Sequence, residues 1–314
     1  MKKILFSLLA ISFCFSLMAQ TALLRMNPEK NRVYRLRSLT NQTVSQTING
    51  NQQTTESKVD YVFSMKMMDV TPDFFIAEIH FDTIITKTNA MGKQINISSA
   101  VEGNIASGET SEIMSCIMNR LSKNAVYTKV DFTGKPVEIL NGKLLSDMIL
   151  KDTSSITLKE PLKAALRSQI EGTVSDNSLK TMIGMFTWNL PGNEVKAGDE
   201  WTNATQTSSG GMTLDIKTKY HLLDIKGDLA NVTAESNIKA AENAPPIKSG
   251  GATVTYDNLQ GLSKSSLVLN VRTGLVVESK GQSHITGNLG ISGPGFSMQM
   301  PMDINSESTI TALQ

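Results

Sequence analysis

Alternating apolar and polar positions predict two β-hairpins far apart in the chain. In the first, apolar side chains recur at every second position of two extended segments, at Tyr61, Phe63, Met65, Met67, Ala77, Ile79 and Phe81. A period of two is typical of strands with one buried face. The second hairpin, over residues 216–234, repeats this pattern. Asp224 opens its turn where Asp69 opens the first turn, an offset of 155 positions.

Two shorter echoes accompany the hairpins. Residues 131–138 resemble residues 271–278, with their Thr-Gly pairs 140 positions apart, and residues 31–34 resemble residues 198–201. A Thr-Gly pair signals a tight turn, because glycine accepts a positive φ without a Cβ clash. The common order of the three echoes predicts a structural duplication, with chance similarity between hairpins as the alternative.

Helical spacing is confined to a few segments. Apolar residues at i and i+4 predict helices over residues 109–121, 144–149, 161–170 and 175–188. Ser175 or Asp176 provides an N-cap for the last of these, and Pro191 ends it. The helices therefore gather between the two β-rich parts, except for one inside the first part.

These patterns predict an α+β protein of mostly antiparallel strands. Residues 1–19 form a signal peptide, 20–139 an N-terminal β-rich lobe with one helix, 140–190 a helical middle, and 191–314 a C-terminal β-rich lobe. Because the apolar face of a sheet needs a cover, we expect the helices to lie between and against two structurally similar lobes. The sheets then form either a clam-like pair or one large open barrel.

The first residues have the form of an export signal. Lys2 and Lys3 precede an apolar run from Ile4 to Ala19, which is typical of a cleaved signal peptide. A retained membrane anchor is the alternative, but the run is shorter than the roughly 20 residues that span a bilayer. Phe13 stands before Cys14, where a lipobox requires a small residue. We expect a periplasmic or secreted protein with no transmembrane segment after cleavage.

Composition narrows the range of functions. The chain has 40% hydrophobic residues, a formal net charge of +1 and two cysteines. Disorder throughout the chain is excluded by this hydrophobic fraction, and a zinc cluster or disulfide framework by the lack of thiols. The near-neutral charge argues against nucleic acid as a partner. No cofactor motif is present, and Cys116 fits a small residue of a helix core.

Catalytic patterns are absent from the sequence. His80, His221 and His284 have no metal-ligand spacing, and no Gly-x-Ser-x-Gly pentapeptide occurs. Glu138 and Glu278 occupy matching positions of the repeat, so we interpret both as solvent-exposed carboxylates at strand ends. We expect a protein that is not an enzyme, and His284, Glu138 and Glu278 are the residues whose substitution would test a catalytic alternative.

Methionine is abundant, with 16 residues, and falls on apolar phases of strands and helices. Unbranched, polarizable methionine lines surfaces that fit irregular apolar ligands, although it also fills ordinary cores. A possible apolar ligand groove comprises Met65, Met67, Met114, Met118, Met182, Met298 and Met300. Core filling is the alternative for the same residues.

Several of these segments together resemble a known family. They are Asn-Arg-Val-Tyr over residues 31–34, Met-Met-Asp-Val over 67–70, Asp-Phe-Thr-Gly-Lys-Pro-Val over 131–137, and Val-Lys-Ala-Gly-Asp-Glu-Trp over 195–201. In this combination the chain resembles a family of exported Bacteroidota proteins known only as a domain of unknown function. The Gly-Asp-x-Trp strand start is the most specific motif. The resemblance covers nearly the whole mature chain and implies an envelope or secreted location, but no activity.

The sequence thus favours an exported, non-catalytic binding protein that holds an apolar or amphiphilic ligand between a curved sheet and helices. Sheets lidded by helices shield acyl chains in other exported proteins, which is an analogy of fold only. The alternative is a module that binds another envelope protein or a glycan through strand edges and loops. An uncharacterised enzyme is the third possibility.

Overall fold

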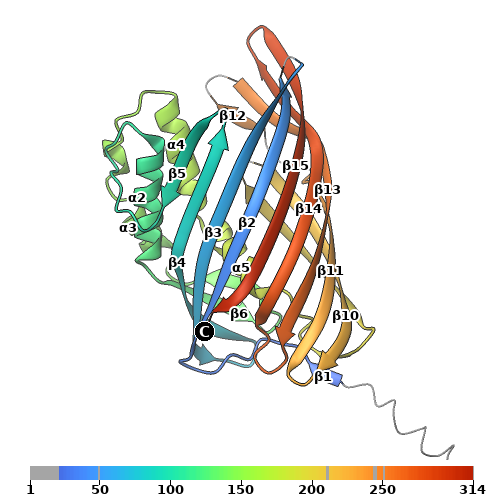
Figure 1. Ribbon diagram of the computed structural model, residues 1–314. Helices are drawn as coiled ribbons and strands as arrows, with labels where there is room; N and C mark the ends of the chain where they lie inside the picture. The colour runs from blue at the N-terminus through green and yellow to red at the C-terminus, as the bar shows by residue number, and fades with distance from the viewer. Residues whose placement is uncertain (1–20, 49, 210–211, 243–245, 250–251, 314) are drawn as a thin grey trace, which may run out of the picture.

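One large antiparallel sheet dominates the protein. The computed structural model describes residues 21–48, 50–209, 212–242, 246–249 and 252–313, so the predicted signal peptide and Cys14 lie outside the described residues. Figure 1 shows the sheet as a strongly curved wall of long, tilted strands. Thirteen strands follow the order β7-β6-β4-β3-β2-β15-β14-β13-β11-β10-β9, with β5 added on β4 and β12 on β13.

The strands of the first half are β2 (Val33–Ile48), β3 (Asn51–Val70), β4 (Phe74–Ala90), β5 (Lys93–Ser98), β6 (Val126–Asp131) and β7 (Pro136–Ile139). Those of the second half are β9 (Glu200–Ser209), β10 (Met212–Lys226), β11 (Leu229–Ala240), β12 (Ile247–Ser249), β13 (Ala252–Asn270), β14 (Val276–Gly293) and β15 (Phe296–Leu313). Two short strands, β1 (Thr21–Leu23) and β8 (Glu194–Lys196), form a separate pair.

The strand order repeats itself. From one end, the first half reads β7-β6-β4-β3-β2 and the second reads β14-β13-β11-β10-β9, with β15 between them. The sequence echoes equate β2 with β9, β3 with β10, β4 with β11, β6 with β13 and β7 with β14, so both halves run in the same direction. The expected α+β fold of mostly antiparallel strands is confirmed, and its two similar halves are joined by β15 into one open sheet.

Local irregularities repeat as well. The register of the first hairpin shifts between Met67 and Asp69, and that of the second between Leu222 and Asp224, again 155 positions later. A bulge is a specific feature that depends on local sequence, so its recurrence at the equivalent place favours duplication over chance similarity.

The β6–β7 and β13–β14 turns share a second device. Asp131 Oδ1 accepts a hydrogen bond from the Thr133 amide at 2.9 Å, and Asn270 Oδ1 accepts one from the Thr273 amide at 3.0 Å. The glycine of each turn has a positive φ, of 89° at Gly134. A side chain at either glycine would overlap backbone of another segment. The two turns therefore share a threonine amide held by a side-chain oxygen and a tightly packed glycine, although Asn270 stands one position before the residue that matches Asp131.

The helices are α2 (Thr110–Ser122), α3 (Gly142–Ile149), α4 (Leu162–Thr173) and α5 (Asp176–Thr187), with a 3-10 turn at Thr153–Ser155. Helix α2 packs on β4 and β5, and Figure 1 shows α2, α3 and α4 beside these strands. Helix α5 instead contacts both β7 and β9, the two end strands of the sheet. Its Ser175 N-cap, one of two predicted, accepts a hydrogen bond from the Ser178 amide at 3.3 Å.

The inner face of the sheet carries two apolar clusters. The main core includes Phe63, Phe81 and Ile117, with Phe186 of α5 stacked on Phe63 at 4.6 Å between ring centroids. The second, smaller cluster contains Leu214, Ile238, Leu259, Met302 and Ile304. Helix α5 therefore reaches from the gap between the end strands into the centre of the main core.

A row of uncharged polar residues separates the two clusters on the same inner face. We call this row the polar belt, and its members pair across neighbouring strands from β4 to β9: Thr88, Ser57, Gln42, Ser306, Ser283, Ser263, Ser236, Thr218 and Asn203. Several are joined by hydrogen bonds, such as Thr218 with Ser236 at 2.8 Å. All are half-buried. The concave side of the sheet is thus apolar, polar and apolar in succession along the strands.

Candidate functional site

A partly open pocket of about 680 Å³ lies where α5 meets the inner face of β9 and β10, and we call it the internal cavity. One wall comes from the inward positions of the two strands, at Asn203, Thr205, Thr207, Ile216, Thr218 and Tyr220. The opposite wall comes from α5 and the residues that flank it. Lys135 of the β6–β7 turn and Pro136, the first residue of β7, also contribute to this wall. Asn203 and Thr218 belong to the polar belt, so the belt ends in this cavity.

Helical geometry brings one side of α5 to the cavity. Asn177, Thr181, Met185 and Trp188 recur at intervals of three and four residues, which places them along one face of a helix. The opposite face buries Leu179, Ile183 and Phe186 in the main core. Met185 is 52% exposed, a large value for an apolar side chain. The lining of α5 is thus polar near its N-terminus and apolar toward Trp188.

Tyr220 forms the floor of the cavity and is paired with Trp201, which does not itself line the cavity. The ring of Tyr220 stacks on Trp201, with centroids 5.3 Å apart and planes 7° from parallel. The Trp201 Nε1–H donates to the carbonyl oxygen of Asn189 at 3.0 Å, and the Tyr220 hydroxyl donates to Asn189 Oδ1 at 3.2 Å. Burial raises the pKa of Tyr220 to about 12, so this hydroxyl stays protonated near neutral pH.

The cavity carries positive charge without negative charge. Among the described residues, its lining includes Lys135 and Lys180 and no aspartate or glutamate. The Lys135 ammonium lies over the ring of Trp188, with Nζ 4.9 Å from the ring centroid. Within the described part of the chain, neither lysine forms an ion pair.

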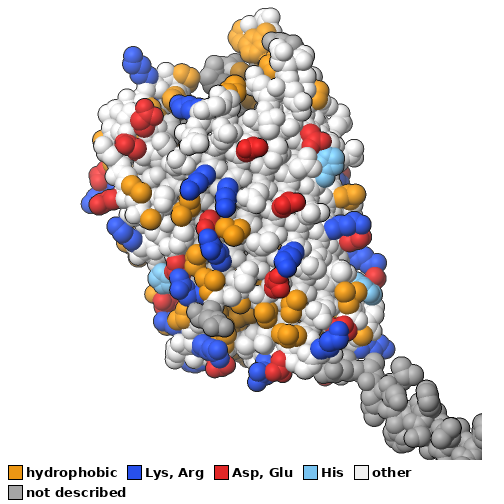
Figure 2. Space-filling view, in the orientation of Figure 1, with side chains coloured by type: hydrophobic (Ala, Val, Ile, Leu, Met, Phe, Trp, Pro, Cys, Tyr) orange, Lys and Arg blue, Asp and Glu red, His pale blue; other side chains and the backbone are white. Residues whose placement is uncertain are grey.

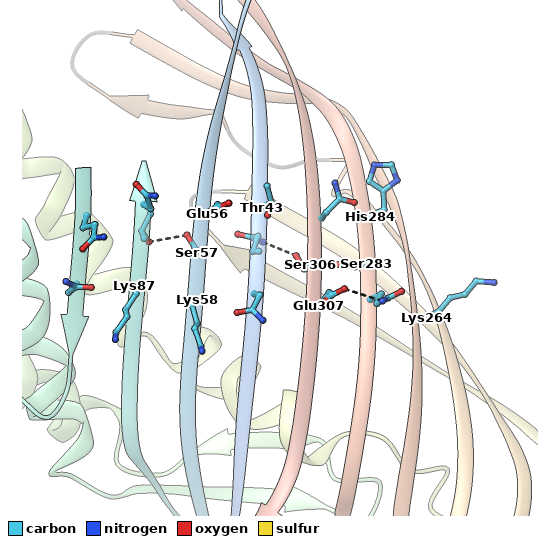
Figure 3. Close-up of a pocket in the computed structure, with 18 of the residues that line it drawn as sticks. Thr43, Glu56, Ser57, Lys58, Lys87, Lys264, Ser283, His284, Ser306 and Glu307 are labelled. Atoms are coloured by element: carbon cyan, nitrogen blue, oxygen red, sulfur yellow. Dashed lines mark hydrogen bonds between the residues drawn. The ribbon is translucent and has the colours of Figure 1, made fainter. Parts of the chain in front are cut away.

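A second hollow, of about 1050 Å³, crosses the outer face of the sheet from β5 to β13. We call it the outer trough, and Figure 3 shows its side chains, among them Glu56, Lys58, Lys87, Lys264 and Glu307. These five charged residues are exposed and occupy the phase of their strands opposite to the core, and they alternate with half-buried residues of the polar belt, such as Ser57 and Ser306, that also line the trough. Figure 2 shows positive and negative groups interspersed over this face. Mixed charges on an open surface are typical of a solvated face, so the internal cavity is the stronger candidate.

The seven methionines of the predicted groove do not line either hollow. Met65, Met67, Met114, Met118 and Met182 belong to or pack against the main core. Met300 is 5% exposed and Met298 is half-buried, both on β15. This packing favours the core-filling alternative for the first five, and a methionine ligand groove stays a prediction.

The residues that do line the cavity were missed by sequence analysis. Met185 and Trp188 belong to the predicted helix over 175–188, but its pattern does not say which face meets a sheet. The cavity-facing threonines of β9 occupy inward positions where apolar residues would be expected. This run of polar residues at inward positions is the signal that sequence analysis overlooked.

The residues chosen to test catalysis are not brought together. Glu138 on β7 pairs with Lys129, and Glu278 on β14 pairs with Lys280, on strands separated by five others. His284 lies in the outer trough, 2.7 Å from Asp303. In the described ranges, no three His, Cys, Asp or Glu side chains are placed to hold a metal ion. The same ranges contain no helix long and apolar enough to cross a membrane.

The protein is thus an open antiparallel sheet with a repeated strand order, and helix α5 lies between its two end strands, β7 and β9. A family model matches residues 72–276, and the chain belongs to this family of unknown function, DUF6263. The expected membership of a domain-of-unknown-function family is confirmed. No curated protein sequence matches the chain.

Solved structures with related shapes are distant. A lipovitellin structure described by its lipid-protein interactions matches 91% of this chain with 8% identity and a TM-score of 0.47. The chain spans only 25% of that lipovitellin chain. An outer membrane channel from Pseudomonas putida F1 matches 92% of this chain and 97% of its own, with 7% identity and a TM-score of 0.30.

Proposed function

We propose that the protein is a non-catalytic binding protein that holds an amphiphilic ligand in the internal cavity. The observation that carries this proposal is the mixed lining. Trp188, Met185 and Ile216 supply apolar surface, while threonine hydroxyls and the Asn203 amide supply hydrogen-bonding groups. A volume of about 680 Å³ falls within the range of roughly 300–1,000 Å³ common for small-ligand sites.

The lining favours binding over catalysis. Among the described residues that line the cavity there is no histidine, cysteine or carboxylate, the groups that most often transfer protons or attack substrates. The Tyr220 hydroxyl is already engaged with Asn189. The cavity therefore offers shape, apolar contact and hydrogen bonds, which is what retention of a ligand requires.

A cavity-filling variant tests the proposal. Thr205 lines the cavity from β9, and Thr43 lies on the outer trough of β2, so Thr205→Phe and Thr43→Phe are a matched pair. Binding of dodecyl maltoside below its micelle concentration is followed by tryptophan fluorescence. Trp188 lines the cavity, and the other tryptophan, Trp201, stacks on the lining residue Tyr220. We expect Thr205→Phe to weaken binding at least about tenfold and Thr43→Phe to leave it unchanged.

Native mass spectrometry of the purified protein provides an independent measurement. A co-purifying small molecule that Thr205→Phe removes and Thr43→Phe retains supports the proposal. If no amphiphile binds, or if both variants bind equally well, the internal cavity is not a ligand site.

We also propose that the chain is exported, which rests on the charged and apolar pattern of residues 1–19. Fractionation of producing cells and the mass of the mature chain test this. An intact N-terminus in the cytoplasmic fraction would contradict export.

A glycan- or protein-binding surface is the second candidate. The outer trough favours it through its exposed amides, including Asn41, Asn89 and Gln94. Sedimentation with insoluble polysaccharide, compared between the native chain and Asn89→Ala, measures this. Loss of co-sedimentation in that variant would favour the outer trough over the internal cavity.

A further inference from the structure

We propose that the internal cavity selects amphiphiles with an anionic head, a carboxylate or a phosphate, held between Lys135 and Lys180. This inference rests on the proposed function and adds the chemistry of the ligand. Both lysines line the same cavity, one from the end of the β6–β7 turn and one from α5. Each lysine carries an ammonium group that can donate hydrogen bonds to an anionic head.

The charge balance of the cavity differs from that of the outer trough. The trough's lining holds Glu56 and Glu307 among its lysines, and some lysines elsewhere pair with carboxylates, as in the Lys66–Glu78 pair at 3.2 Å. In the described lining of the cavity there are two lysines and no acidic residue. In a partly enclosed site the attraction between opposite charges is stronger than in bulk water. An anionic head therefore gains more there than a neutral or cationic head.

Asp131 is near Lys135 in the sequence, but it is not among the described residues that line the cavity and forms no ion pair with Lys135. Its Oδ1 accepts hydrogen bonds from the Thr133 amide, the Thr133 hydroxyl and the Lys135 amide, at 2.9, 2.6 and 2.9 Å. These bonds fix the backbone of Lys135, while the Trp188 ring supports its ammonium group. A side chain held in this way loses less conformational freedom when it binds a ligand.

The inner wall reinforces the same preference. The polar belt that reaches the cavity consists of hydroxyl and amide side chains and contains no carboxylate. Asn203 and Thr218 can therefore hydrogen-bond to a head group without repelling a negative charge. Ile216 and Met185 remain as apolar contacts for the tail.

Four probes with the same dodecyl tail test the inference: tridecanoate, dodecyl phosphate, dodecyl maltoside and dodecyltrimethylammonium, each below its micelle concentration. We expect both anions to bind at least about tenfold more tightly than the maltoside, and the cation most weakly. A tighter carboxylate would identify a fatty-acid-like ligand, and a tighter phosphate would identify a phosphate monoester.

Charge-removing variants locate the effect. Lys135→Gln and Lys180→Gln should each weaken binding of the anions by about three- to tenfold, and the double variant by more, with no change for the maltoside. Lys87→Gln is the control, because Lys87 is an exposed lysine of the outer trough. Added salt should weaken anion binding in the native chain more than in the double variant.

The outcomes separate this inference from the proposed function. Maltoside binding that Thr205→Phe blocks, together with equal affinities for all heads or no effect of the double lysine variant, overturns the anionic preference and leaves the binding function intact. Failure of all four probes, or indifference of all of them to Thr205→Phe, overturns both.

Discussion

The two junctions between the halves of the sheet are built from different elements. At one junction β15 follows β14 and pairs along its length with both β14 and β2. At the other, α5 comes after β7 in the chain and contacts β7 and β9. Because β7 corresponds to β14 and β9 to β2, the helix occupies the place that the strand occupies at the first junction.

The difference explains where the cavity lies. A strand pairs through its backbone on both edges and leaves neighbours about 4.8 Å apart, so little space remains at the β15 junction. A helix is about 10 Å wide and cannot extend the ladder, so it leaves β9 without a backbone partner on that side. The internal cavity lies there, between α5 and the inner face of β9 and β10. The repeated strand order forms the wall, and the cavity lies at the junction where a helix stands in the place of a strand.

The first way to break the helical junction is to remove its aromatic anchor. Phe186 is 2% exposed and stacks on Phe63, so Phe186→Ala should lower the free energy of unfolding by about 3–5 kcal/mol. Urea unfolding measures this loss. Met185→Ala, one residue away but half exposed, should change it by less than about 0.5 kcal/mol. Equal effects of the two variants would mean that α5 does not depend on the main core.

The second prediction concerns the equivalent turns of the two halves. At Gly134 an added Cβ would overlap the Thr187 carbonyl oxygen, and at Gly274 that of Arg25. We expect Gly134→Ala and Gly274→Ala each to cost about 2–4 kcal/mol, from positive φ together with overpacking. Gly198→Ala is the control, because Gly198 has a φ of 92° but open space around it. It should cost about 1–2 kcal/mol. Thermal unfolding would refute the comparison if all three variants were equal.

The third prediction uses the pH dependence of the cavity floor. Burial holds the pKa of Tyr220 at about 12, above that of an unfolded tyrosine near 10, so the folded state favours the protonated form. This stability is complete below about pH 10 and is lost as the pH rises toward 12, by about 3 kcal/mol at most. Urea unfolding at several pH values should therefore show a shallower alkaline loss in Tyr220→Phe. An unchanged slope would contradict the assignment.

The smallest expected effect is the loss of one hydrogen bond at the helical junction. The Thr187 hydroxyl donates to the Gly134 carbonyl oxygen at 2.6 Å, and Thr187 is 2% exposed. Thr187→Val keeps the shape but leaves that carbonyl oxygen without this donor, so it should cost about 1–2 kcal/mol. Thr128→Val removes a similar bond, at 2.9 Å, to Glu138 within the first half. Only the Thr187 variant should also alter ligand binding in the fluorescence titration.

The sequence predicted the elements better than their assembly. Period-two alternation identified both hairpins, and spacing of four identified the helices, because each pattern records one buried face. It did not show that β15 pairs with β2, since pairing depends on residues that are not neighbours in the chain. The 155-position offset nevertheless predicted the duplication, and the matching bulges after Met67 and Leu222 support it.

The candidate site was beyond sequence reasoning for a related physical reason. The abundance of methionine suggested Met65 and Met114 as ligand contacts. Both are buried in the main core, because apolar side chains are stabilised by burial there. The cavity is made instead by threonines and asparagines on inward positions, which a hydrophobicity pattern treats as solvent-facing. Lys135 and Lys180 are far apart in the sequence, and only the packing of α5 on β7 brings them to the same cavity.

The bonding of β15 to β2 also has a consequence for folding. Gln42 and Ser306 meet across this junction although they are 264 residues apart in the chain. Contacts of such long range are associated with slow folding, because a large loop must close before the contact forms. Until β15 arrives, one edge of β2 has no partner, and bare edges are where sheets recruit foreign strands. This edge of β2 therefore stays exposed until β15 has been made and pairs with it.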